Sequence, residues 1–218
     1  MKTKKSDLIV IGVSALSLAG IAAIYPRFPE TVPVHWNFAS VPDSWGPRWT
    51  ILLMGALPLA VYLLMKLGPR FDPRKEAFLR HAAAYSVLTA VISLCFVPIT
   101  WIVALASLGI PVDVGVLVRI VIGVLFVVIG NFLGKFRPNY FVGIRTPWTL
   151  TDPEVWRKTH RRGGWTFVAM GAAMLASVAV PHSALAAALV FASILGGVAY
   201  LFIYSYLEYR KSAAAKTS

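Results

Sequence analysis

The sequence predicts an all-α membrane protein, a bundle of six transmembrane helices with one short cytoplasmic amphipathic helix. The first observation is composition: 58% of the 218 residues are apolar and 14% are charged, whereas soluble domains have about half and about a quarter. The second is that the apolar residues form unbroken blocks of about 18 or more, the length that crosses a bilayer. The third is that the basic residues gather in alternate loops between these blocks. Together these observations predict a chain that crosses the membrane repeatedly.

Six apolar blocks are the candidate spans. Each is expected to be helical, because a lone segment in lipid satisfies its backbone only as a helix. The first block follows a basic start, as in a signal peptide, but its length favours a retained helix. No internal repeat divides the chain, which predicts a single integral membrane domain over residues 1–218. The predicted spans are 8–25, 49–67, 83–108, 114–134, 165–180 and 185–207, with an outer loop at 26–48 and a cytoplasmic loop at 135–164.

The placement of Lys and Arg predicts the orientation. A net charge of +12 could by itself suggest a nucleic-acid partner, but here the charges lie in loops between apolar blocks. Eighteen of the 21 Lys and Arg residues fall in the N-terminus, the tail and the loops after the second and fourth spans, whereas the opposite side has Arg27 and Arg48. By the positive-inside rule, both termini are therefore cytoplasmic. The predicted partner of this charge is the lipid bilayer, with no direct contact to nucleic acid.

Signatures of catalysis, of metal binding and of cofactor binding are missing from the sequence. It has no Gly-rich phosphate loop, no His-Glu-x-x-His motif, no nucleophile elbow and no close pair of carboxylates. His160 with Asp152 and Glu154 would make a poor catalytic cluster, since helix capping explains their spacing better. The single cysteine, Cys95, cannot form an intrachain disulfide and is expected to be a packing residue. We therefore predict no catalytic residue, no metal and no cofactor.

The outer loop is longer and stiffer than a connection between two helices requires. It contains four prolines within residues 28–48, which restrict the chain to extended and turn conformations. Its aromatic residues, Trp36, Phe38 and Trp45, suit either a recognition surface or a plug anchored among lipid headgroups. A plain hydrogen-bonding role is expected for His35, because no second ligand for a metal lies nearby.

The cytoplasmic loop contains a predicted helix over residues 152–162. Thr151 and Glu154 form a predicted capping box, and a proline is tolerated in the first helical turn. Trp156 lies on an apolar arc of this helix and Arg161 on the opposite basic arc, which predicts a helix lying on an anionic inner leaflet. The run before the helix is polar and aromatic. Three of its residues are candidates to pair with a phosphate, a carboxylate or a partner protein, namely Arg145, Thr146 and Trp148.

Polar residues within the spans are few. Arg119, near the outer end of the fourth span, is either a functional charge or a side chain that reaches outward to Asp113. Asn131 lies near the inner end of the same span. One face of this span has three glycines, which predicts close helix packing, namely Gly123, Gly130 and Gly134. The third span has a stripe of hydroxyl groups that either bridge helices or line a solute path, namely Ser86, Thr89, Ser93 and Thr100.

Both unusual loops contain motifs of one family. The outer motifs are Pro29-Glu30, Pro33 to Asn37 and Pro42-Asp43. The inner motifs are Gly130-Asn131, Gly134-Lys135, Arg137 to Phe141, Gly143 to Leu150, Val155-Trp156 and Lys158 to Arg161. With these motifs the chain resembles the SdpI/YfhL family of bacterial membrane proteins, including its N-terminal conserved domain of unknown function.

This resemblance implies a function in the bacterial cell membrane. The implied function is immunity to a secreted peptide toxin, together with signalling by recruitment of a cytoplasmic transcriptional repressor. The residues expected to meet the toxin are His35, Trp36, Asn37 and Asp43. The residues expected to meet the cytoplasmic partner are Asn139, Arg145, Thr146, Trp148, Trp156, Lys158, His160 and Arg161. The alternative is a small-solute transporter or channel-like protein that uses Arg119, Asn131 and the hydroxyl stripe.

Overall fold

The computed structural model describes residues 5–74 and 82–217. Four basic residues that enter the orientation argument, Lys2, Lys4, Lys75 and Arg80, lie outside the described residues. The fold is mostly helical, with one small sheet and short 3-10 turns at Tyr25–Arg27, Gly68–Arg70 and Ser177–Ala179. The α-helices are α1 (Lys5–Ile24), α2 (Trp49–Leu67), α4 (Ala82–Ser107), α5 (Val114–Leu133), α6 (Pro147–Thr151), α7 (Pro153–Ala176) and α8 (Ser183–Thr217).

Among the described residues, five helical segments are long and apolar enough to cross a membrane. They are Lys5–Arg27, Trp49–Arg70, Ala82–Ser107, Val114–Leu133 and Ser183–Ala215. Many of their large apolar side chains are exposed on the protein surface, as Leu16, Leu64 and Leu195 are. A surface of this kind suits a lipid environment. The prediction of a mainly α-helical membrane protein is therefore confirmed.

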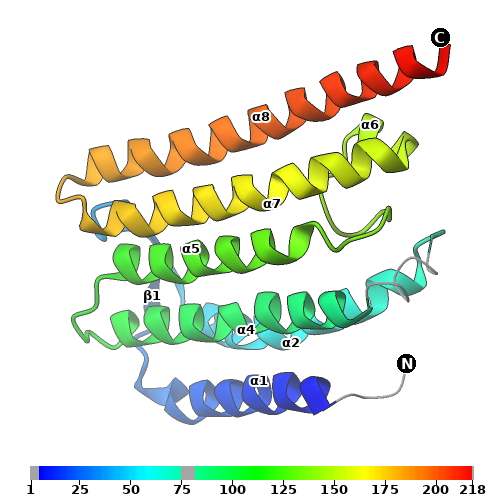
Figure 1. Cartoon of the computed structure of the whole chain (residues 1–218). Helices are drawn as coiled ribbons and strands as arrows, with labels where there is room; N and C mark the ends of the chain where they lie inside the picture. Colours follow the sequence, from blue (N-terminus) through cyan, green and yellow to red (C-terminus); the bar gives the residue numbers. More distant parts are fainter. Residues whose placement is uncertain (1–4, 75–81, 218) are drawn as a thin grey trace.

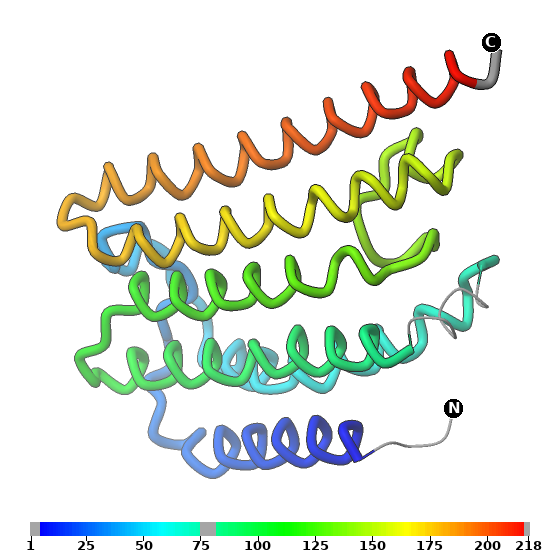
Figure 2. Tube along the Cα trace, in the orientation of Figure 1, coloured from blue at the N-terminus to red at the C-terminus, as the bar shows by residue number. Residues whose placement is uncertain are grey.

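The long helices lie side by side and form a bundle. Along one direction, α1 packs on α2 and α4, α4 on α5, α5 on α7, and α7 on α8 (Figure 1). The start of α1 and the end of α8 lie at the same end of the bundle (Figure 2). The segment joining α5 to α7 lies at that end too, whereas the turns between α4 and α5 and between α7 and α8 lie at the opposite end.

Glycines bring α5 and α7 into close contact. A Cβ atom added at Gly130 would lie 2.6 Å from the carbonyl oxygen of Gly164, and one at Gly171 would lie 2.6 Å from the carbonyl oxygen of Gly123. Backbone can approach backbone at this distance only where no side chain intervenes. The predicted packing role of the glycine face on the fourth span is confirmed for Gly123 and Gly130.

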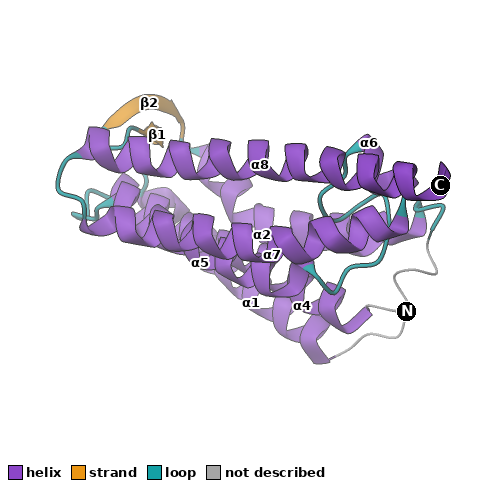
Figure 3. Ribbon diagram, turned by 45° about the horizontal axis from the view of Figure 1, so that its top comes forward, coloured by secondary structure: helices purple, strands orange, loops and turns teal. Residues whose placement is uncertain are grey.

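The outer loop forms a two-stranded β-hairpin, a small addition to the mainly helical fold that the sequence did not predict. β1 (Thr31–Trp36) pairs antiparallel with β2 (Pro42–Pro47), and the register is irregular near His35. Figure 3 shows the hairpin against one end of the bundle. Val32 is fully buried, in one core cluster with Ile21 of α1 and Val103 of α4. The prolines hold the chain extended, and this buried face fixes the extended chain onto the helices.

The predicted amphipathic helix and the predicted fifth span are one continuous helix, α7. The Gly163-Gly164 pair does not interrupt it, because both glycines pack against other parts of the bundle: Gly163 faces Ile144 and Leu133, and Gly164 faces α5. The N-cap residue lies one position later than the predicted cap, Thr151. Asp152 is the N-cap residue, and its carboxylate accepts hydrogen bonds from the backbone N–H groups of residues 154 and 155.

Candidate functional site

The outer hairpin presents a polar pair on its exposed surface. His35 Nδ1 lies 2.5 Å from Asp43 Oδ1, and both side chains are accessible to solvent. Asn37 has a different role, since its side-chain oxygen accepts hydrogen bonds from the N–H groups of Ala39 and Val41 at 2.9 and 3.1 Å. Of the four predicted ligand residues, Asn37 therefore shapes the turn, and its amide oxygen is occupied by the backbone.

The tip of the hairpin is fastened to the start of α5. The hydroxyl of Ser40, a residue with φ of 59°, donates a hydrogen bond to Asp113 and accepts one from the N–H of Gly115 at 2.9 Å. Asp113 is also the N-cap of α5 and accepts from the N–H of Val116. The hydrogen bond from Ser40 is the main cause that lowers the pKa of Asp113, and the charge of Arg119 adds to it. The loop is thus tied to the bundle at both its base and its tip.

The two predicted intramembrane residues do not share a site. Arg119 donates from Nε to the carbonyl of Gly115 at 3.0 Å and from Nη1 to the carbonyl of Ser177 at 3.1 Å, so it joins α5 to the outer end of α7. Its guanidinium carbon lies 6.0 Å from the ring centre of Phe38 in the hairpin. Asn131 donates to Val127 within its own helix, on an exposed face.

Two members of the hydroxyl stripe of α4 contact α1 and α2, whereas Thr89 and Ser93 are buried without such a contact. Thr100 donates to the carbonyl of Met54 in α2 at 2.9 Å, and Ser86 lies 3.3 Å from Ser6 of α1. These groups bridge helices, and Arg119 bridges a different pair. A polar path that combines Arg119 with the stripe, as the transporter interpretation requires, is therefore not assembled in this structure.

A groove runs between the hairpin and the turn that joins α4 to α5. It encloses about 390 Å³. Trp36 and Trp45 line it from the hairpin, and Ile110 and Pro111 line it from the turn. Trp45 has the largest side chain of β2, and yet it is 61% exposed. Sequence reasoning placed Trp36 here but did not include Trp45 among the site residues, since register alone decides which aromatic side chains face the turn.

The inner loop is organised around a buried asparagine. Asn139 is inaccessible to solvent, donates to the carbonyls of Arg137 and Val142, and accepts from the N–H groups of Phe141 and Val142. Every polar atom of the side chain is bonded within the loop. Asn139, predicted as a partner contact, therefore holds the loop together in this structure, since buried polar groups need such partners.

Trp156 and His160 lock this loop onto α7. The two rings stack at 3.9 Å, Trp156 Nε1 donates to the carbonyl of Phe136 at 2.8 Å, and both side chains are buried. His160 Nε2 accepts from the N–H of Ile144 at 3.0 Å, so its Nδ1 donates to the carbonyl of Trp156. Burial lowers the pKa of His160 to about 4. Trp156 and His160 thus hold the loop on α7 in this structure, and both side chains, predicted as partner contacts, are buried.

A glycine makes this lock possible. Gly143 has φ of 119°, and a Cβ atom there would lie 2.2 Å from His160 Nε2. Residues other than glycine are strained in this backbone conformation. The glycine therefore lets the loop pass close over the imidazole ring.

Thr146 and Trp148, two further residues of the predicted cytoplasmic site, attach the inner loop to α8. Thr146 caps α6 and donates to the hydroxyl of Ser205 at 3.1 Å. Trp148 packs edge-on against Phe202 at 4.9 Å between ring centres. Thr146, also predicted as a partner contact, is buried in this structure. Arg145 stays exposed and donates to the carbonyl of Tyr140.

Lys158 and Arg161 remain at the surface of α7. Lys158 Nζ lies 2.9 Å from Glu208 Oε2 of α8, whereas Arg161 is exposed. Of the predicted cytoplasmic site, Arg145, Lys158 and Arg161 are thus the charged residues that a partner can reach.

Sequence reasoning missed three buried carboxylates, namely Asp7, Asp72 and Glu208. Asp72 accepts from the N–H groups of Arg74 and Tyr140, which joins the loop after α2 to the loop after α5. Asp7 pairs with Lys66 at 2.6 Å between α1 and α2. Within the part of the chain that the structure describes, no group of three or more His, Cys, Asp or Glu residues could hold a metal ion.

Comparisons with known proteins match both the segment of the inner loop and the segment of the outer hairpin. Residues 135–205, which contain the inner loop, α6, α7 and most of α8, match the SdpI/YfhL protein family. Residues 12–58, which contain the hairpin, match a domain of unknown function, DUF1648. The resemblance to the SdpI/YfhL family is confirmed. The chain is 26% identical over 167 residues to "Immunity protein SdpI" of Bacillus subtilis (strain 168), which covers 77% of this chain and 78% of that protein. No solved structure matches the chain.

Proposed function

We propose that this chain is a membrane immunity protein that gives its cell resistance to a secreted antimicrobial peptide. The observation that carries the proposal is the outer hairpin, which presents an aromatic groove beside the His35–Asp43 pair. The similarity to an immunity protein supports it, since the matched regions include both the hairpin segment and the inner loop.

The proposal includes six crossings with both termini in the cytoplasm of a bacterial cell. The second half of α7 would be the crossing that is added to the five long apolar segments. It lies between α5 and α8 and runs beside both. The first half of α7 is too polar to count as a span, and it meets the basic inner face. The hairpin lies at the end of the bundle opposite to the start of α1, so this orientation places the groove outside the cell (Figure 1).

The groove suits a peptide with apolar side chains. Two tryptophans and several prolines line it, and both kinds of residue lose little conformational entropy when a ligand binds. The anchoring of the hairpin to Asp113 and Gly115 keeps the groove formed before binding. The polar pair at residues 35 and 43 can orient a peptide by hydrogen bonds at the exposed surface of the hairpin. Capture of the toxin at this surface would keep it from acting on the bilayer.

The inner face supports a second part of the proposal, recruitment of a cytoplasmic repressor. Arg145 precedes the buried Trp156–His160 stack in the sequence and Arg161 follows it directly, and both arginines are exposed. Guanidinium groups of this kind bind carboxylates on a protein partner. In this proposal the buried stack holds the two arginines in place, and the arginines make the contact.

A killing assay tests the proposed immunity. A sensitive bacterium would express the chain and be challenged with a purified peptide toxin. The peptide would come from a strain that secretes it and carries a similar immunity protein. We expect protection by the parent, and loss of most of it in Trp36→Ala/Trp45→Ala at equal abundance in the membrane. The matched control is Trp49→Ala, which removes an exposed tryptophan that does not line the groove. Equal protection by all three proteins would contradict an outer recognition site, and no protection by the parent would contradict immunity to that peptide.

A further inference from the structure

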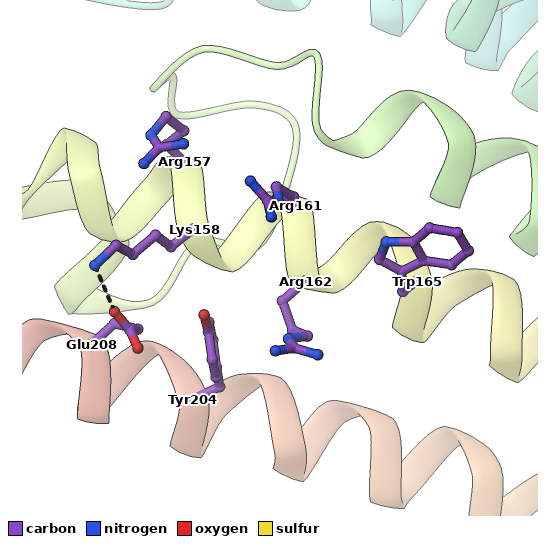
Figure 4. A pocket seen from close by; sticks show the side chains of 7 residues that line it. All are labelled: Arg157, Lys158, Arg161, Arg162, Trp165, Tyr204 and Glu208. Atoms are coloured by element: carbon purple, nitrogen blue, oxygen red, sulfur yellow. Dashed lines mark hydrogen bonds and ion pairs between the residues drawn. The ribbon is translucent and has the colours of Figure 1, made fainter.

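A basic cleft lies between α7 and α8 at the inner end of the bundle. It encloses about 370 Å³. Four cationic side chains of α7 line it together with Trp165, and α8 contributes Tyr204 and Glu208 (Figure 4). The cations are Arg157, Lys158, Arg161 and Arg162. This cleft is separate from the outer groove, and it shares Arg161 with the surface proposed above for a cytoplasmic repressor.

Two of the four cations already have carboxylate partners. Arg157 binds Glu154 through two hydrogen bonds of 2.9 and 2.6 Å, and Lys158 binds Glu208 at 2.9 Å. Lys211 also binds Glu208, at 3.1 Å, so two ammonium groups neutralise this carboxylate.

The other two cations, Arg161 and Arg162, form no ion pair with any carboxylate in the described part of the chain. The guanidinium carbon of Arg162 lies 5.6 Å from the ring centre of Tyr204, and Figure 4 shows Arg162 extending toward α8. Both residues are exposed. Adjacent like charges raise the electrostatic potential of the cleft and repel each other until an anion enters. The net positive charge of the cleft therefore favours the binding of an anion.

The position of Trp165 places the cleft at the membrane surface. Its side chain is 73% exposed, one helical turn from Arg161 toward the apolar half of α7. Exposed tryptophans at the ends of spans lie among lipid headgroups, and one helical turn corresponds to about 5.4 Å. On α8, Tyr204 lies beside Arg162 and Glu208 lies beside Lys158, so both are displaced from Trp165 toward the polar half of α7 (Figure 4). In the proposed orientation, the level of the unpaired guanidinium groups suits contact with phosphates of the inner leaflet.

We propose that this cleft binds one phosphate group, supplied by the headgroup of an anionic phospholipid of the cytoplasmic leaflet. Arg161 and Arg162 provide planar pairs of N–H donors that match phosphate oxygens, and Lys158 adds a third positive charge. Tyr204 and Trp165 flank the headgroup from the two helices. Soluble phosphate compounds carry the same chemical group, and the experiment separates the two sources.

Native mass spectrometry of the full-length protein in neutral detergent tests this site. The probe is phosphatidylglycerol, titrated into the parent protein and into Arg161→Gln/Arg162→Gln. We expect one tightly held lipid in the parent and an affinity at least about tenfold lower in the variant, since each hydrogen bond to a charged group contributes about a factor of ten or more. The matched control is Arg70→Gln/Arg210→Gln, which removes two other arginines of the cytoplasmic side and should bind like the parent.

A second arm uses inorganic phosphate. Thermal unfolding of the same three proteins would be followed with sodium phosphate and with sodium chloride at equal ionic strength. Stabilisation by phosphate that needs Arg161 and Arg162, without retention of phosphatidylglycerol, would assign the site to a soluble phosphate compound and overturn the lipid source. Equal binding of both probes by the parent and by Arg161→Gln/Arg162→Gln, or no binding at all, would overturn the site itself. Neither arm measures killing, so the outcome is independent of the proposed immunity.

Discussion

The two ends of the bundle use similar residue types in opposite ways. At the outer end, Trp36 and Trp45 line an open groove and the His35–Asp43 pair is exposed. At the inner end, Trp156 and His160 are stacked, buried and bonded to backbone groups of the loop between α5 and α6. Trp45 is open to a ligand and Trp36 lines the groove while packing on the core, whereas Trp156 and His160 are fully buried. A tryptophan and a histidine in a sequence motif are therefore accessible to solvent in one place and part of the buried architecture in the other, and only their burial distinguishes the two.

The largest effect expected from this comparison is on stability at the inner end. Trp156→Ala removes a buried ring and a hydrogen bond to Phe136, so we expect a loss of about 3–5 kcal/mol in the free energy of unfolding. Trp45→Ala removes an exposed ring of the groove, and we expect a change within about 0.5 kcal/mol. Denaturant titration in detergent measures both. Equal losses for the two variants would contradict the division between architecture and recognition.

The second expected effect is a pH dependence that arises from the inner end. The folded protein holds the pKa of His160 at about 4, below its ordinary value of 6.5. The unfolded chain therefore binds the proton first as the pH falls, so stability is complete above about pH 6.5 and declines toward pH 4, by ~3 kcal/mol in all. Unfolding measured across this range checks it. In His160→Gln, this part of the pH dependence should be absent, and an unchanged slope in that variant would assign the titration to another group.

The third expected effect concerns the helix contact that lies between the two ends. Gly130→Ala places a methyl group 2.6 Å from a backbone oxygen of α7, so we expect a loss of about 1–3 kcal/mol in stability. Gly196→Ala, on a face of α8 with nothing within 4 Å, is the control, and it should be neutral or stabilising by up to about 1 kcal/mol. Thermal unfolding of both variants in the same detergent provides the comparison. A neutral Gly130→Ala would show that α5 and α7 can separate freely.

The smallest expected effect lies at the tip of the outer hairpin. Ser40→Ala removes the hydrogen bonds to Asp113 and Gly115, and we expect amide exchange in residues 38–41 to rise about fivefold, consistent with ~1 kcal/mol for a hydrogen bond. Ser44→Ala on the exposed side of β2 is the control and should leave exchange at the tip unchanged. Protection against the toxin should fall modestly in Ser40→Ala alone. Unaltered exchange would mean that the tip is held by Phe38 packing on Phe191 instead.

The sequence predicted the helical membrane fold well because bilayer thickness dictates the length of apolar blocks. The predicted span 49–67 coincides with α2, and the glycines of the fourth span mark its contact with α7. The hairpin was missed because its prolines interrupt the alternation by which strands are recognised. The continuity of α7 was missed because the Gly163-Gly164 pair resembles a break, and only the tertiary contacts show that both glycines are packed within a helix.

The candidate site was less predictable than the fold. Motif residues of the inner loop looked like a contact surface because they are polar and aromatic. Their burial depends on Gly143, whose positive φ lets the loop fold back over His160, and this closure is a long-range event that local patterns do not reveal. The charged residues Arg145 and Arg161 kept their predicted exposure, since charged side chains are rarely buried without a partner.

The central claim is that the outer groove receives the toxin, and site-specific photocrosslinking in living cells tests it most directly. A photoreactive amino acid would replace Trp45 in one protein and Arg145 in another, in cells that remain protected. We expect the peptide toxin to be captured from position 45 and not from position 145. Capture from position 145 alone, or from neither position in a protected cell, would contradict recognition by the outer hairpin.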